Sequence, residues 1–186
     1  PAIQKGLIGG ICCTGANLEE DVFNAIEGHR YKQVDWRSLS PSDEEELVKD
    51  GWNRVTDTCI PENVMQHVWG LLLESWNDQS GKTPYFHLCC VLDKLIEDGV
   101  IVPRLNESWV WAAHNAGIPV FVPGWSDSTT GNMFTASVKK GEIKTGYNAV
   151  VSDAEQFAIL ANWYESQITE SGESPAFLQI GGGIAG

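Results

Sequence analysis

The chain has 186 residues, a hydrophobic content of 42% and a formal net charge of −13. This length can bury one sizeable core, and the negative charge argues against nucleic acid or an anionic membrane as a partner, while it suits a cationic ligand or simply a solubilising surface. No run of about 18 apolar residues occurs, so we expect no transmembrane helix.

A strand–turn–helix unit lies near the start of the sequence. The stretch from Gly6 to Cys13 is short, apolar and spaced by glycines, which predicts a buried strand. The turn Thr14–Asn17 follows, and Leu18 to Glu27 is predicted to be a helix. Its first turn carries Glu19 to Asp21, where the helix dipole favours carboxylates. Such a unit is typical of α/β proteins.

Helical signals dominate the middle of the chain. Residues 51–58 are expected to be a loop or short strand, and residues 60–63 to open the helix that follows. Caps and apolar spacing predict four helices: one capped by Ser42 with Glu45 as its capping-box partner, then Val64–Trp76, Tyr85–Gly99 and Ser108–Asn115.

The last third supplies two more predicted strands, Ile118–Pro123 and Ala176–Ile180, with a helix over Ala154–Glu165 between them. Strands that alternate with helices predict an α/β fold with a mostly parallel sheet, helices on both faces and a Rossmann-like nucleotide-binding architecture. We expect residues 1–186 to be one such domain. Because a glycine turn at a bare chain end would fray, we also expect a longer parent chain.

Three loops directly follow the predicted strands: residues 14–21, residues 124–132 and the glycines Gly181, Gly182 and Gly183. Ligands of parallel α/β sheets bind beyond the carboxyl ends of the strands, so the three loops predict one shared ligand site. Three independent polar turns are the alternative. The pattern G-x-G-x-x-G at 181–186 is a weak signal, because a tight turn would also explain it.

Several side chains in these loops have two interpretations. Glu19 and Glu20 either complement the helix dipole or hold a cation. Asp127 binds ribose hydroxyls or a cation, or else its own backbone. The loop hydroxyls lack a Gly-x-Ser-x-Gly pattern, so we expect no serine hydrolase. The five cysteines form no Cys-x-x-Cys motif, which predicts reduced thiols in a cytoplasmic protein and no metal site.

The same loops resemble deoxyhypusine synthase. The segment Thr14–Asp21 is similar to the family's Thr-Ala-Gly-Gly followed by Glu-Glu-Asp, and Ile118–Pro123 with Asp127 and Gly131–Met133 is similar to its Ile-Pro-Val-Phe strand and Gly-Asp-Met loop. Gly181–Gly183 matches its triple glycine, and Gly51–Arg54 and Pro61 match the intervening segment. The resemblance spans essentially the whole chain.

The resemblance implies an NAD-dependent transfer of the aminobutyl group of spermidine to an acceptor amine in a cytoplasmic homotetramer. It assigns Glu19, Glu20 and Asn132 to spermidine. The residues that it assigns to NAD are Thr14, Gly15, Ala16, Glu20, Asp127, Gly181, Gly182 and Gly183.

Two departures from the family pattern keep alternatives open. Asn132 replaces the acidic residue of Gly-Asp-Met, and residues 14–17 rearrange the usual glycines, which favours a bacterial branch with either a protein lysine or a free polyamine (homospermidine-type product) as acceptor. No tryptophan precedes Gly-Lys, the family's lysine motif. We therefore expect a fragment that lacks portions at both ends, holds no catalytic residue and is inactive alone. A non-catalytic partner of a lysine-bearing subunit, or a nucleotide-binding module, is the alternative.

Overall fold

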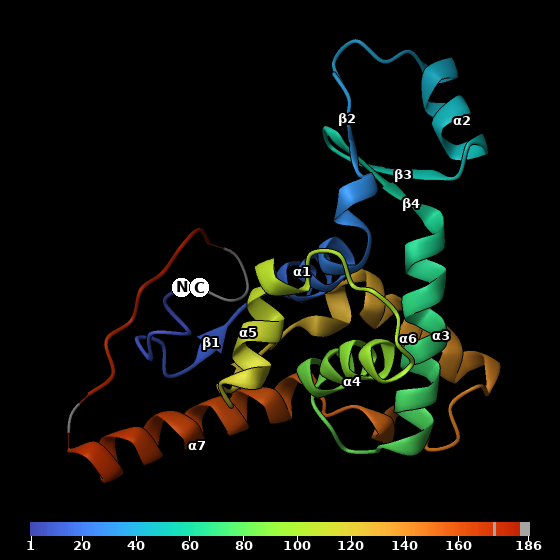
Figure 1. Ribbon diagram of the computed structural model, residues 1–186. Helices are drawn as coiled ribbons and strands as arrows, with labels where there is room; N and C mark the ends of the chain where they lie inside the picture. Colours follow the sequence, from blue (N-terminus) through green and yellow to red (C-terminus); the bar gives the residue numbers. More distant parts are fainter. Residues whose placement is uncertain (173, 183–186) are drawn as a thin grey trace.

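The computed structural model describes residues 1–172 and 174–182. Figure 1 shows a helical body from which a small sheet and one helix project. The helices and strands in chain order are β1 (Ile11–Cys12), α1 (Gly15–Glu27), β2 (Lys32–Gln33), α2 (Pro41–Lys49), β3 (Trp52–Val55), β4 (Thr58–Pro61), α3 (Glu62–Asp78), α4 (Pro84–Glu97), α5 (Trp109–Asn115), β5 (Val120–Phe121), α6 (Thr129–Lys140) and α7 (Asp153–Ser171). This arrangement confirms an α/β protein.

The first and fifth strands are parallel neighbours, with Ile11 opposite Val120 and Cys12 opposite Phe121. The two predicted strands therefore exist and pair as expected, although each ladder is only two residues long. Residues 6–10 lie outside the ladder because β5 offers no partner there. The residue before β5, Pro119, has no N–H group to donate to a longer ladder.

The β1–β5 pair has helices on both faces. Val120 and Val122 pack into the main core together with Leu18 of α1. Phe121 points the other way, where its ring lies 5.5 Å from that of Trp163 on α7. Side chains alternate along a strand, so these contacts place α1 and α7 on opposite faces of the pair.

The larger of the two described sheets is antiparallel, in the order β2-β4-β3. The expectation of a mostly parallel sheet is therefore not met within the described residues. The stretch 52–61 forms a hairpin instead, which turns at Thr56 with a positive φ of 55°. The predicted helix start at residues 60–63 is also wrong at Ile60 and Pro61, which belong to β4.

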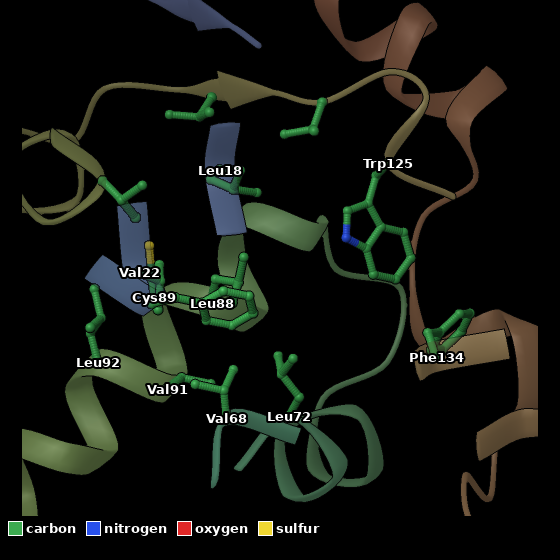
Figure 2. Packing of buried hydrophobic residues seen from close by; sticks show 14 of the residues in the cluster. Leu18, Val22, Val68, Leu72, Leu88, Cys89, Val91, Leu92, Trp125 and Phe134 are labelled. Atoms are coloured by element: carbon green, nitrogen blue, oxygen red, sulfur yellow. The ribbon is translucent and has the colours of Figure 1, made fainter. Parts of the chain in front are cut away.

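The core lies where α1, α3 and α4 meet, and Figure 2 shows their apolar side chains converging there. Val64, Val68, Leu72 and Trp76 of α3 are all at most 1% exposed. Their helical spacing was the basis of the sequence prediction, and it is confirmed. The predicted helices over 85–99 and 108–115 are likewise confirmed to within a few residues.

Three other sequence predictions need correction. The cap of α2 is Ser40, not Ser42, because Pro41 fits the first helical position and Asp43 completes the capping box. The polar loop after β5 is short, since α6 begins at Thr129. Residues 176–180 form no strand but lie extended, with Phe177, Leu178 and Ile180 between 75% and 88% exposed. Apolar pattern alone does not make a strand without a partner to complete its ladder.

Candidate functional site

Two of the three loops predicted from sequence meet at the carboxyl ends of β1 and β5. The point of closest approach is Gly15, the first residue of α1. A Cβ atom placed on Gly15 would lie 2.6 Å from Cβ of Ser128 and 3.3 Å from Cα of Trp125. Real Cβ atoms do not approach so closely, so glycine is required here for the loop that carries Asp127 to pack against the β1–α1 turn.

Glu19 joins these two loops. Its side chain is 4% exposed, and its carboxylate accepts hydrogen bonds from the backbone nitrogens of Thr129 (2.9 Å) and Thr130 (2.8 Å) and from Oγ1 of Thr130 (2.8 Å). These nitrogens are among the first N–H groups of α6, which have no partner within their own helix. A buried carboxylate at this position stabilises the start of α6, and the hydrogen bonds that it accepts compensate for the burial of its charge.

Asp21 makes the equivalent contact with a third helix. Its carboxylate accepts hydrogen bonds from the hydroxyl of Ser108 and from the backbone nitrogens of Val110 (3.1 Å) and Trp109 (3.3 Å), at the start of α5. One short acidic stretch of α1 therefore positions the N-termini of two other helices. The sequence analysis instead expected Asp21 to complement the dipole of its own helix, and Glu19 either to do the same or to hold a cation.

Glu20 lies between Glu19 and Asp21 but is exposed. Partial burial of its carboxyl group, followed by the repulsion of Glu19, raises the pKa of Glu20. The pKa of the Tyr31 phenol is raised to about 12, by burial first and then by the nearby carboxylates of Glu20 and Glu27, against the opposing effect of Arg104. Sequence reasoning missed Tyr31, which lies outside every recognisable motif.

The hydroxyl of Tyr31 is buried and has no hydrogen-bond partner within the described part of the chain. Such a group costs free energy unless a partner arrives. It interacts electrostatically with Glu20, Glu27 and Arg104, so these side chains form a charged patch. Glu20 is the exposed carboxylate of this patch and could receive an amine.

The remaining residues that were predicted to bind the ligand lie near the carboxyl ends of β1 and β5. Thr14 caps α1 by accepting from the nitrogen of Asn17 at 3.2 Å. The N–H groups of Gly15 and Ala16 precede the first intrahelical bond and need an acceptor from outside the helix. Asp127 is exposed in the short 3-10 turn Trp125–Asp127, and Asn132 is exposed in the first turn of α6.

The third predicted loop does not join the other two. Gly181 and Gly182 lie on the exposed extended stretch, where a Cβ atom built on either residue would meet no atom within 4 Å. Gly183 lies outside the described residues. The ligand role of the glycines therefore stays a prediction.

The loop after β5 is also held from the α7 side. The hydroxyl of Ser126 donates to the carboxylate of Asp153, and Oε1 of Gln156 accepts from the nitrogen of Val122 at 3.2 Å. Gln156 is 1% exposed. Sequence reasoning missed this contact, because a polar residue in a predicted helix is ordinarily assigned to its solvent face.

The polar groups at this edge could hold a dinucleotide. The N–H groups at the start of α1 suit a pyrophosphate, since the helix dipole adds to them. The exposed carboxylate of Asp127 suits ribose hydroxyls. The α6 N-terminus does not compete for the phosphates, because Glu19 already occupies it.

No three side chains of His, Cys, Asp or Glu are grouped to hold a metal ion within residues 1–172 and 174–182. None of the helices in the described ranges combines the length and apolarity needed to cross a membrane.

Comparison with known proteins identifies one family. The family model of deoxyhypusine synthase matches residues 1–185. The "Probable deoxyhypusine synthase" of Methanopyrus kandleri is 28% identical over 129 residues, which are 69% of this chain and 37% of that protein. The "Deoxyhypusine synthase-like protein" of Chlorobaculum parvum is 26% identical over 133 residues, 69% of this chain and 35% of that protein. The match thus covers little more than a third of the length of either relative.

Proposed function

The chain belongs to the deoxyhypusine synthase family, and from this premise we propose that it supplies the dinucleotide- and amine-binding part of an NAD-dependent transfer of the aminobutyl group of spermidine. The observation that carries the proposal is the close packing of the Thr14–Ala16 turn against the loop of Asp127, at the carboxyl ends of two parallel strands. This is where parallel α/β proteins bind nucleotides.

Each residue has a role that follows from its surroundings. The N–H groups of Gly15 and Ala16 bind the pyrophosphate of NAD, and Asp127 accepts hydrogen bonds from ribose. NAD itself supplies a hydride acceptor beside the amine. Glu19 positions the two loops relative to each other rather than touching spermidine, because both its carboxylate oxygens are already engaged.

Glu20 is the carboxylate that remains available for spermidine. Ala16 and Glu20 are four residues apart, about 6 Å along one side of α1, so an amine held by Glu20 lies one helical turn from the proposed phosphate site. A cationic amine favours the ionised form of Glu20 and opposes the effects that raise its pKa. Gly181, Gly182 and Gly183 complete the cofactor site in this proposal, and Asn132 contributes a neutral contact to the polyamine.

The acceptor is either a protein lysine or a free polyamine. The replacement of an acidic residue by Asn132 removes one charge partner for a polyamine and leaves both acceptors open. In a second possibility this chain works beside a subunit that carries the family's Trp-Gly-Lys motif, which does not occur in these 186 residues. We propose a homotetramer if the chain acts without a separate lysine-bearing subunit, and a hetero-oligomer if it acts with one.

NAD titration followed by calorimetry tests the cofactor site. Asp127→Asn should weaken NAD binding roughly 10- to 100-fold, since it removes charge-assisted hydrogen bonds. Asp78→Asn, at the exposed end of α3, is the matched control and should leave binding unchanged. Equal affinity in the two variants would remove Asp127 from the site, and no binding of NAD to the chain would contradict the proposal as a whole.

Mass spectrometry of products separates the acceptors. The chain is incubated with NAD, spermidine and a candidate acceptor, either a free polyamine or a lysine-containing protein, with or without a lysine-bearing family member. A homospermidine-type product identifies a free polyamine acceptor, and modified protein lysine identifies the other. Product that forms only in the mixture supports the partner-subunit alternative.

A further inference from the structure

The short turn Trp125–Asp127 holds its three side chains in three different ways. Trp125 is 5% exposed, and its indole N–H donates to the hydroxyl of Thr130 at 2.8 Å. The hydroxyl of Ser126 donates to a carboxylate at the start of α7. The carboxylate of Asp127 is exposed and makes no hydrogen bond or ion pair within residues 1–172 and 174–182. Two side chains therefore anchor the turn, and the third is free for a ligand.

Trp125 is connected to Glu19 of α1 through a single hydroxyl group. Oγ1 of Thr130 accepts from the Trp125 indole and donates to Oε2 of Glu19, and both distances are 2.8 Å. Thr130 is buried, as is Glu19. A hydroxyl has only one proton to donate, so the carboxylate on one side and the indole N–H on the other fix its orientation. The three groups therefore form one directed chain of hydrogen bonds from the turn to α1.

Packing also restrains the indole ring of Trp125. Its centroid lies 5.4 Å from that of Phe134 on α6, and Figure 2 shows the indole directed from its loop toward the core. The backbone beside it has no spare room, because a Cβ atom on Gly131 would lie 2.4 Å from the carbonyl oxygen of Trp125. Trp125 therefore has little freedom to move, and its backbone fixes where Asp127, two residues later, leaves the loop.

We infer that Trp125 is a positioning residue for Asp127. Because Asp127 is the ribose ligand of the proposed function, this role rests on that proposal. The indole N–H holds the turn against α1, whose first N–H groups bind the pyrophosphate in the same proposal. Covalent bonds limit the distance between ribose and pyrophosphate in a dinucleotide, so the two halves of the site must keep a matching distance. A support that is rigid before the ligand arrives lowers the entropy cost of binding.

A tryptophan that only stabilised the fold would leave the interaction between Asp127 and NAD unchanged. A positioning tryptophan has a different consequence. Once its N–H group is lost, the carboxylate of Asp127 no longer lies where ribose can use it. Removal of that carboxylate then costs little further affinity. The two roles of Trp125 therefore differ in the coupling between the two residues, which a double-mutant cycle measures.

Calorimetric titration of NAD on the Trp125→Phe and Asp127→Asn cycle tests the role. Phenylalanine keeps a ring beside Phe134 but has no N–H group. Trp125→Phe alone should weaken NAD binding about tenfold. Asp127→Asn should cost roughly 10- to 100-fold in the wild type and less than about threefold in the Trp125→Phe background. An equal cost in both backgrounds would make the two residues independent and overturn the inference.

Thr130 allows a second test from the other end of the same hydrogen bond. Thr130→Val keeps the shape of the side chain without its hydroxyl and should weaken NAD binding about tenfold, whereas Thr130→Ser keeps the hydroxyl and should stay within about twofold of the wild type. Val91→Ala, in the buried face of α4, is the control that lowers stability and should leave NAD affinity unchanged. Equal weakening in Thr130→Ser and Thr130→Val, or in Val91→Ala, would assign the effect to stability and overturn the inference.

Amide hydrogen exchange without NAD, measured by NMR, separates this inference from the proposed function. The N–H of Asp127 donates to the carbonyl oxygen of Gly124 at 3.1 Å. It should exchange at least about tenfold faster in Trp125→Phe and Thr130→Val than in the wild type and Thr130→Ser. A wild type that binds no NAD would contradict the proposed function, while this difference in exchange would still support the anchoring of Asp127 by Trp125. Equal exchange in all four proteins would overturn the inference whether or not NAD binds.

Discussion

Oε2 of Glu19 lies 2.8 Å from both the backbone nitrogen and Oγ1 of Thr130. The two residues are separated by 111 positions in the sequence, so one carboxylate of α1 determines where α6 begins. Because α1 and α6 each follow a strand of the parallel pair, this contact also fixes the spacing between the Thr14 turn and the loop of Asp127. The site therefore depends on a buried charge that touches no ligand in our proposal.

Replacement of Glu19 should destabilise the fold. Glu19→Gln removes the negative charge and turns an amide NH₂ toward backbone N–H groups, which leaves buried donors unpaired. We expect the free energy of unfolding, measured in urea, to fall by about 2 kcal/mol. Glu20→Gln is the matched control, and as an exposed substitution it should change stability by less than about 0.5 kcal/mol. Equal effects of the two variants would show that the Glu19 bonds contribute little.

Two glycines should tolerate no side chain. A Cβ atom at Gly15 would lie 2.6 Å from Cβ of Ser128, and one at Gly131 would lie 2.4 Å from the carbonyl oxygen of Trp125. Gly15→Ala and Gly131→Ala should each lower the unfolding free energy by about 1–3 kcal/mol, as overpacking does. Gly70→Ala, in α3 with open space around it, should instead raise it by about 0.5–1 kcal/mol. Thermal unfolding of the three variants checks the contrast.

Stability should depend on pH through His87. Nδ1 of His87 lies 2.8 Å from the hydroxyl of Ser75, and Nε2 lies 3.3 Å from the carbonyl oxygen of Ala149. A carbonyl can only accept, so Nε2 carries the proton and Nδ1 accepts from Ser75. Burial lowers the pKa of His87 to about 4.

As the pH falls, the unfolded chain, in which the histidine pKa is about 6.5, binds the extra proton at a higher pH than the folded chain does. The stability present above pH 6.5 should therefore decrease as the pH falls toward 4, by up to about 3 kcal/mol, and this contribution should not change further below that. Urea unfolding at several pH values measures the slope. His87→Gln should lose the slope between pH 6.5 and about 4, and the exposed His67→Gln should retain it. The same slope in both variants would assign it to other groups.

Spermidine binding should also weaken in acid. The pKa of Glu20 is raised by partial burial and then by Glu19, so its carboxylate is neutralised at a higher pH than an ordinary glutamate. Protonation removes the charge that attracts the amine. We expect Glu20→Gln to weaken spermidine binding about two- to fivefold near neutral pH, the range of an exposed ion pair, and to reduce its dependence on pH. Calorimetric titration measures both, with Glu107→Gln as the control at another exposed carboxylate. A variant that binds like the wild type would exclude Glu20 from the amine site.

The local pattern of the sequence was enough to predict the helices of the core and the two parallel strands. Val64, Val68 and Trp76 recur at helical spacing, and the helix predicted over Ser108–Asn115 begins at Trp109, with Ser108 as its cap. Such features depend on neighbours within a few residues, which a sequence displays directly. Motif similarity likewise identified the family, because the Glu19–Asp21 and Asp127 segments retain their order.

Tertiary structure alone decided which of three consecutive carboxylates is free. Glu19, Glu20 and Asp21 look equivalent in the sequence, yet the first caps α6, the third caps α5 and only the second is exposed. Their partners lie more than 80 residues away. The local sequence pattern indicates which structure each segment can form. Which carboxylate is buried depends on hydrogen-bond partners that come close only when the chain folds.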